Sequence, residues 1–130
     1  MTDAAPTVHR VLAATADGCT LVVVEGAATF KLAPAFKQAV QAARLAGSPL
    51  IVADMAGCAS MDSTFMGAIA ALGFAFQKTD ARLALINLSP HADALLKGLG
   101  VDRVVRTYAA GALPAGLGDL APLIQSLRPV

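Results

Sequence analysis

Apolar residues along this chain follow two patterns, short continuous runs and longer segments in which they recur every three or four positions. Short runs rich in β-branched residues are typical of β-strands, and the longer spacing is typical of amphipathic helices. The short runs predict strands at residues 8–14, 20–25, 50–55, 81–88 and 103–108. The helical spacing predicts helices at 32–46 and 65–76, a third after Ser89-Pro90, and a short one at 120–127.

Turn and capping residues mark the ends of several of these segments. Asp17-Gly18 predicts a hairpin between the first two strands, because glycine reaches positive φ without steric cost. Gly47 to Pro49 ends the first helix, and Pro34 fits its first turn, where a missing N–H costs nothing. Ser89-Pro90 supplies an N-cap and a first helical residue for the third helix. The residues of that helix expected to point inward are Ala94, Leu95 and Leu99.

Strands and helices alternate through most of the chain, which predicts an α/β fold. Right-handed crossovers make neighbouring strands parallel, whereas the opening hairpin is antiparallel. We therefore expect a mixed, mostly parallel β-sheet packed by helices. The apolar run at 50–55 is typical of a central strand, and the less apolar first strand is expected at a sheet edge. The 130 residues suit one domain, with a core at 8–108 and a C-terminal tail at 109–130.

The charge pattern argues against two common classes of partner. The formal net charge is +1 and there is no run of Lys or Arg, so we expect no direct binding of nucleic acid and no attraction to anionic membranes. The apolar runs are far shorter than the roughly 18 residues that a membrane-spanning helix needs. The sequence after Met1 also lacks the basic and then apolar layout of a secretory signal. These features predict a cytoplasmic protein without membrane insertion.

Side chains that bind metals or catalyse reactions are few. Cys19 and Cys58 have no short-spaced partner, which favours reduced thiols packed as small hydrophobic groups over a disulfide or a zinc site. His9 and His91 are not near a cysteine pair or an acidic cluster. The sequence around Ser63 lacks the G-x-S-x-G pattern of a nucleophile elbow. We therefore expect no metal site, no cofactor and no enzymatic activity.

Three polar residues, Asp62, Ser63 and Thr64, interrupt an otherwise apolar stretch. They follow an expected loop at 56–60 and precede a helix that has almost no charged face before Gln77-Lys78. Ligands of α/β proteins gather at such strand-to-helix junctions, where a phosphate on a hydroxyl would meet free N–H groups and the positive end of the helix dipole. Asp, Ser and Thr are also the preferred N-cap residues, so a purely structural cap is the alternative.

Three segments resemble the STAS domain family, and most closely its stand-alone bacterial members, the anti-sigma factor antagonists. The stretch ADMAGCASMDSTFMGAIAALG is similar to the family's strand, loop and phosphorylation motif of the MDSSGLG type. The stretch INLSPHADALLKGLGVDRVVRTY is similar to the region in which SP opens a helix and GL precedes the last strand. The stretch LVVVEGAATFKLAPAFKQAV is similar to the G-x-[LF]-D segment in Gly26 and the following helix. The resemblance covers residues 8–108 and implies a single STAS domain.

The resemblance implies a partner-switching protein. In the family, the unphosphorylated domain binds an anti-sigma factor that is also a serine kinase of the histidine-kinase-like ATPase type. This kinase phosphorylates the motif serine, which breaks up the complex, and a metal-dependent serine phosphatase reverses the reaction. Carried onto this chain, Ser63 is the acceptor, Thr64 is a second candidate acceptor, and Asp62 shapes the turn. The implied partner-binding residues are Gly26, Thr29, Ser60, Met61, Asp62, Ser63, Thr64, Phe65 and Met66, within a loop and helix start at 60–66 and an adjoining loop at 26–31.

Two positions depart from the family pattern. Phe65 replaces the glycine that usually follows the two hydroxyl residues, and Thr29 stands where an acidic residue is usual after Gly26. These departures favour an alternative function, in which a STAS-like domain is a constitutive scaffold or adaptor subunit of a transporter or signalling assembly. In that alternative Ser63 is only part of a helix cap.

Overall fold

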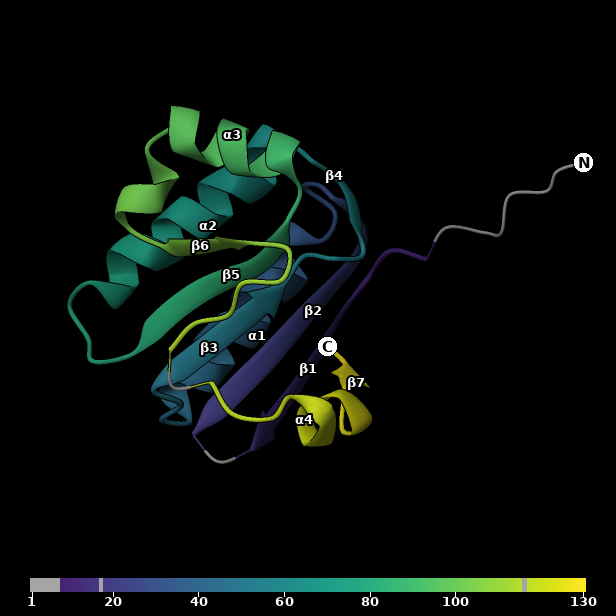
Figure 1. Ribbon diagram of the computed structural model, residues 1–130, viewed down its shortest axis with the longest axis vertical. Helices are drawn as coiled ribbons and strands as arrows, with labels where there is room; N and C mark the ends of the chain where they lie inside the picture. Colours follow the sequence, from purple (N-terminus) through teal and green to yellow (C-terminus); the bar gives the residue numbers. More distant parts are fainter. Residues whose placement is uncertain (1–7, 17, 116) are drawn as a thin grey trace, which may run out of the picture.

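The computed structural model describes residues 8–16, 18–115 and 117–130, in which seven strands form one sheet with helices packed against it (Figure 1). The strands lie in the order β6-β5-β3-β2-β1-β7, and β4 pairs with β2 off this path. The strands are β1 (Arg10–Ala16), β2 (Cys19–Ala28), β3 (Leu50–Asp54), β4 (Cys58–Met61), β5 (Arg82–Leu88), β6 (Arg106–Ala109) and β7 (Arg128–Pro129). The helices are α1 (Ala33–Leu45), α2 (Ser63–Phe76), α3 (Pro90–Gly98) and α4 (Ala121–Gln125), with a short 3₁₀ helix η1 (Val101–Arg103).

The strand pairing confirms the predicted fold class, an α/β fold with a mixed, mostly parallel sheet and an antiparallel N-terminal hairpin. All of β1 pairs antiparallel with residues 19–25 of β2. The pairs β2–β3, β3–β5 and β5–β6 are parallel, as the crossovers through α1, α2 and α3 require. Gly18 has a φ of 77°, as expected of a hairpin glycine, and Asp17 lies outside the described residues.

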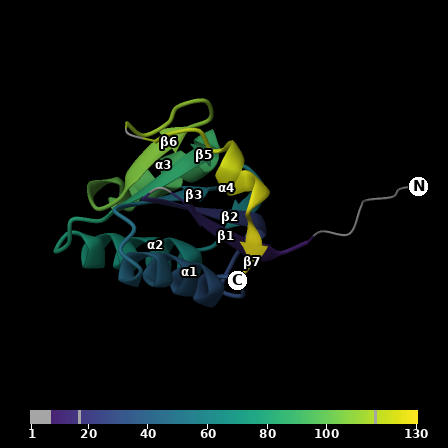
Figure 2. The ribbon, with the colours of Figure 1, turned by 90° about the horizontal axis from the view of Figure 1, so that it is seen from below.

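The two faces of the sheet are covered differently (Figure 2). α1 and α2 pack against one face, where the rings of Phe36 and Phe65 meet with centroids 4.8 Å apart. This main core also contains residues that are completely shielded from solvent, among them Val40, Ile51, Ile69 and Leu85. The C-terminal segment lies against the other face, where Leu123 of α4 closes a smaller core with Leu21, Val52 and Ile86.

Proline and polar caps begin the helices as the sequence predicts. Pro34 lies in the first turn of α1. Ser89 is the N-cap of α3, its Oγ accepts a hydrogen bond from the Ala92 N–H at 3.1 Å, and Pro90 follows as the first helical residue. No helix in the described part of the chain is long and apolar enough to cross a membrane.

The segment at 56–60 was expected to be a loop, but its residues from Cys58 onward belong to strand β4. β4 runs parallel to the end of β2, with Ala27 opposite Ser60 and Ala28 opposite Met61. This pairing is possible because β2 continues to Ala28, beyond its predicted end at residue 25, while its neighbour β3 stops at Asp54. The last residues of β2, 26–28, therefore extend past β3, and their free backbone edge pairs with β4.

The predicted inward face of the third helix is wrong. Leu96 is the fully buried residue of α3, whereas Ala94, Leu95 and Leu99 are exposed, Leu99 by 64%. The helix carries apolar residues on two faces, and only the face of Ala92 and Leu96 meets the main core. Helical spacing alone does not show which of two apolar faces is buried.

Both ends of the strand order also differ from expectation. β1 is not an edge strand, because β7 pairs with it through Leu12 opposite Pro129 and Ala13 opposite Arg128. The last predicted strand begins later than residue 103, because residues 101–103 turn into η1 and β6 starts at Arg106.

Candidate functional site

The predicted site lies where two segments distant in sequence are joined at one end of the sheet. One segment is the turn at 29–32, which links β2 to α1, and the other is the junction between β4 and α2. The backbone N–H of Asp62 donates to the carbonyl of Ala28 at 3.0 Å, which continues the β2–β4 pairing into the junction. The structure therefore brings together the two loops, 26–31 and 60–66, that the sequence analysis grouped.

Asp62 holds these two segments through its side chain. It is the N-cap of α2, with extended backbone angles, and its Oδ1 accepts from the Phe65 N–H at 2.8 Å. Its Oδ2 accepts from the Phe30 N–H in the opposite turn at 2.9 Å. One carboxylate thus satisfies two backbone donors that lie more than thirty residues apart in sequence.

Ser63 and Thr64 are the first two residues of α2, and both are exposed. The N–H groups of the first helical turn have no acceptor within the helix, and the helix dipole makes this end positive. The first turn of α2 contains no acidic residue of its own. A phosphate on either hydroxyl can therefore be accommodated by the helix start, with the Asp62 carboxylate as its adjacent negative charge.

Phe65 and Met66 are buried and do not lie on the surface predicted to contact a partner. Phe65 is 0% exposed because its ring packs against Phe36, and Met66 is 6% exposed. The bulk that Phe65 adds relative to glycine fills the main core, not the space in front of Ser63. A direct contact of a partner with either side chain requires the core to open.

Gly26 is also buried, and its role is structural. It lies in β2 with a φ of 91°, and a Cβ there would lie 2.5 Å from the backbone oxygen of Val8 and from Nδ1 of His9. His9 Nδ1 accepts from the Ala27 N–H at 2.9 Å. The positive φ and the close approach of this N-terminal segment both favour glycine.

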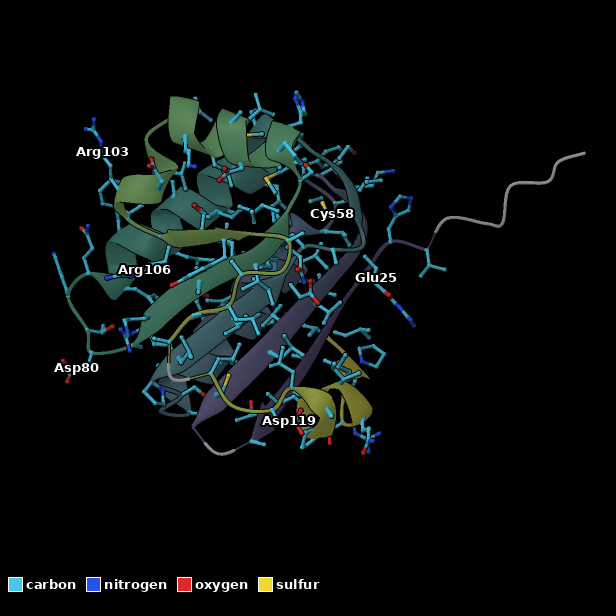
Figure 3. All side chains as sticks on the ribbon, viewed as in Figure 1. Glu25, Cys58, Asp80, Arg103, Arg106 and Asp119 are labelled. Carbon is cyan, nitrogen blue, oxygen red and sulfur yellow. The ribbon has the colours of Figure 1, made fainter. Side chains whose placement is uncertain are left out.

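The remaining predicted residues form an accessible rim. Ser60 is exposed, and Thr29 and Met61 are half-buried. Met61 lines a small cavity of about 40 Å³ together with Met55, Cys58, Leu88 and Leu95. Cys58 donates from its Sγ to the carbonyl of Ser60 at 3.0 Å, and burial raises the pKa of its thiol above the ordinary value. Figure 3 shows Cys58 at this end of the sheet, where β4 lies.

Phe30 also belongs to this site, although it is not among the residues predicted from the sequence. Its side chain is 61% exposed although its backbone is fixed by the bond to Asp62. Exposed aromatic side chains beside an accessible polar centre are typical anchors of protein interfaces. The available signal was its rarity, since the chain has only five phenylalanines and no tryptophan.

Among residues 8–16, 18–115 and 117–130, no group of three or more His, Cys, Asp or Glu side chains could hold a metal ion. Cys19 and Cys58 are free thiols, and both are partly buried. What the site offers chemically is an accessible hydroxyl pair and a rigid, partly apolar surface.

The chain is similar to a known protein family and to several proteins of known structure. Residues 11–107 match a family model described as "Mlab, STAS domain". No curated protein sequence matches the chain significantly.

Several solved structures share the fold. An anti-sigma factor antagonist from Mycobacterium paratuberculosis is 24% identical, with a TM-score of 0.67 over 80% of this chain and 88% of that one. A sulfate transporter family protein from Wolinella succinogenes is 18% identical, with a TM-score of 0.63 over 72% of this chain and 79% of that one. The Bacillus cell fate determinant SpoIIAA in its phosphorylated form is 15% identical, with a TM-score of 0.59 over 74% and 87%.

Proposed function

The chain belongs to the STAS domain family, and we propose that it acts as an anti-sigma factor antagonist, a binding protein controlled by phosphorylation at Ser63. The observation that carries the proposal is the position of Ser63, exposed as the first residue of α2, beside a carboxylate that fixes the neighbouring turn. The likeness to an anti-sigma factor antagonist of known structure supports the same role. Its partner is an anti-sigma factor that is also a serine kinase of the histidine-kinase-like ATPase type.

The proposed binding surface consists of Phe30, Ser60, Met61, Ser63 and Thr64, with Thr29 at its margin. Asp62 is the carboxylate within it, and Lys31 is the nearest cation in the sequence. Phe30 and Met61 are the apolar members of this surface, and the exposed Phe30 is its anchor. Three of the residues predicted to contact a partner are buried and support this surface from below; they are Gly26, Phe65 and Met66.

Phosphorylation would change this surface by charge. In the transfer step, Ser63 Oγ forms a bond to the γ-phosphorus of ATP held by the kinase, the bond from that phosphorus to ADP breaks, and the hydroxyl proton passes to a base of the kinase. The product carries about −1.5 to −2 charges beside the Asp62 carboxylate. Repulsion between them weakens the link between Asp62 and the Phe30 turn and opposes docking of an apolar partner. A metal-dependent serine phosphatase restores the neutral surface by hydrolysis of the phosphate ester.

The proposal is tested by intact-mass measurement and peptide mapping of the protein isolated from its native cells, with and without phosphatase treatment. We expect one phosphoryl group on Ser63 that phosphatase removes, and a partner that co-purifies only with the unmodified form. A Ser63→Ala variant should retain the partner permanently, Ser63→Asp should lose it, and Thr64→Val is the matched control. If phosphate is found on Thr64 alone, the acceptor assignment is wrong.

A constitutive scaffold or adaptor subunit is the second candidate. It is supported by the sulfate transporter family protein that shares the fold and by Thr29, where the antagonists usually carry an acidic residue. Under this function Ser63 belongs only to the helix start. Unmodified peptides under all growth conditions, together with a partner that binds Ser63→Asp as well as the natural protein, would favour it over the switch.

A further inference from the structure

Three sulfur-containing side chains recur at a spacing of three in the segment MAGCASM, residues 55–61. They are Met55, Cys58 and Met61, and together they form what we call the sulfur cluster. All three line the small cavity of about 40 Å³ between β4 and the start of α3 (Figure 1). His91, in the first turn of α3, lines the same cavity. Four side chains that can bind a metal ion therefore surround one space.

A tight turn brings the first two residues of the sulfur cluster together. The Cys58 N–H donates to the carbonyl of Met55 at 3.0 Å. A bond between residues three apart is typical of a β-turn, whose end residues have Cα atoms within about 7 Å of each other. Met55 is 3% exposed and belongs to the main core, and Cys58 packs against the same core. The two side chains therefore lie on the same side of this turn.

An irregularity in β4 brings the third residue to the same side. Residues three apart on a regular strand point to opposite faces. β4, however, advances by two residues where β2 advances by one, from Gly26 to Ala27. An extra residue of this kind is a bulge, and it shifts the alternation of side chains by one position. Cys58 and Met61 are accordingly both half-buried against the main core, whereas the two residues between them are exposed.

The wall of the cavity has the chemistry of a site for a soft metal ion. Thioether and thiolate sulfur atoms select Cu(I), whereas harder cations prefer oxygen ligands. Among the described residues no carboxylate lines the cavity, and Leu88 and Leu95 make much of the remaining wall apolar. One water molecule needs roughly 10–15 Å³ of such space, so a single ion fits without a full hydration shell. Only two of the four side chains are common zinc ligands, which is why their spacing does not predict a zinc site.

The geometry points to a binding site for a monovalent copper ion. Its ligands are the sulfur atoms of Met55, Cys58 and Met61, with an imidazole nitrogen of His91 as the fourth. Binding forms a bond from Cys58 Sγ to copper and breaks the S–H bond, and the proton passes to solvent. Copper remains Cu(I), so the step needs no oxidant or reductant. The hydrogen bond from this thiol to the carbonyl of Ser60, 3.0 Å long, is lost when copper binds.

Cu(I) itself is the probe, titrated without oxygen into the intact chain in competition with the coloured chelator bicinchoninate. We expect one equivalent to bind, with X-ray absorption that shows sulfur neighbours around the copper. Cys58→Ala and Met61→Leu should each weaken binding by about tenfold or more, since even outer partners of a metal site contribute that much. Cys19→Ala and Met66→Leu are the matched controls, because they remove the same kinds of sulfur atom outside this cavity. Neither control should change the affinity.

Four results would overturn the proposal. Absence of a saturable one-to-one site shows that the cavity does not hold copper. Equal losses in Cys58→Ala and Cys19→Ala indicate binding by any free thiol. Unchanged affinity in Met61→Leu shows that the thioether is not a ligand, and displacement of copper by equimolar Zn(II) shows that the site is not selective for a soft ion.

Loss of a ligand can be separated from loss of folding on the same variants. Replacement of Met61 by leucine nearly conserves side-chain volume, so the melting temperature of the metal-free variant should stay close to that of the natural protein. One equivalent of Cu(I) should raise the melting temperature of the natural protein, because the ion binds the folded chain. The rise should be smaller in Met61→Leu and unchanged in Met66→Leu. This site does not depend on phosphorylation of Ser63, so the copper titration leaves the proposed function untouched.

Discussion

Asp62 is the residue on which the geometry of the proposed partner surface depends. Its role as a cap is predictable from the sequence, because Asp is a preferred N-cap residue at the start of a helix. Its second bond, to the Phe30 N–H, could not be predicted, because that donor belongs to a turn brought alongside only by the β2–β4 pairing. The local role of the residue was thus predictable and its long-range role was not.

Replacement of this residue is expected to cost more than loss of an ordinary cap. Asp62→Ala removes acceptors from two backbone donors and should lower the free energy of unfolding by about 2–3 kcal/mol. Ser89→Ala removes one cap bond, at the start of α3, and should cost about 1 kcal/mol. Urea unfolding of the two variants measures the difference. Equal losses would show that the bond to Phe30 adds nothing to stability.

The exposed aromatic side chains allow a matched test of the partner surface. Phe30 and Phe74 are both 61% exposed, but Phe30 lies beside Asp62 and Phe74 lies near the far end of α2. Phe30→Ala should weaken binding to the partner that co-purifies with the natural protein by about 2 kcal/mol or more, the effect of a hot-spot residue. Phe74→Ala should change it little. The measurement is the dissociation constant of the partner for each variant. An equal loss of affinity in both variants would show that the partner binds elsewhere.

The two partly buried thiols should make the free energy of unfolding fall at high pH. Burial raises the pKa values of Cys19 and Cys58 in the folded chain, so thiolate forms more readily in the unfolded chain. This contribution to stability is complete below the unfolded pKa of about 8.5 and is lost as the pH rises through the folded pKa. Urea unfolding from about pH 7 to about pH 10 should show the decline, and a Cys19→Ala, Cys58→Ala double variant should reduce it. Alkylation of the folded thiols at about pH 8 should be slower than in urea.

At the scale of elements, the sequence predicted those whose hydrophobic pattern is long and regular. The central strand at 50–55 and the helix at 65–76 came within a few residues of β3 and α2. β4 could not be predicted because the strand has only four residues, CASM, and they are at most partly buried. Its pairing also depends on how far β2 extends, which the sequence does not show. The exposed face of α3 was misassigned because Ala94, Leu95 and Leu99 have the spacing of a core face without a partner in the fold.

Two glycines of α2 show how closely this helix packs. A Cβ at Gly73 would lie 2.6 Å from Cγ2 of Val105 and 2.8 Å from the carbonyl oxygen of Val104, whereas nothing lies within 4 Å of one at Gly67. Gly73→Ala should destabilise the protein by about 1–3 kcal/mol, because a backbone group must shift. Gly67→Ala should stabilise it by about 0.5–1 kcal/mol through reduced backbone entropy. Thermal unfolding that shows stabilisation in both variants would contradict the close packing.

At the scale of the whole molecule, two features lie on different parts of the sheet. The proposed partner surface lies at the end where α2 begins, and the C-terminal segment covers the face opposite to α1 and α2 (Figures 1 and 2). The fold class was predictable because alternating strands and helices allow few arrangements. The second core was not, because the Ala-, Gly- and Pro-rich tail has little hydrophobic periodicity, and β7 is only two residues long.

The C-terminal segment contributes to stability through one main side chain. Leu123 is 4% exposed and closes the smaller core, whereas its neighbour Ile124 is 55% exposed. Leu123→Ala should lower the free energy of unfolding by about 2–4 kcal/mol, because it leaves a cavity above the sheet. Ile124→Ala should change it by less than about 0.5 kcal/mol. Urea unfolding with both variants at equal protein concentration measures the difference, and similar values for the two would show that the segment does not seal this face. If Leu123→Ala also exposes the face, hydrogen exchange should increase at Leu21, Val52 and Ile86 and remain unchanged in α1.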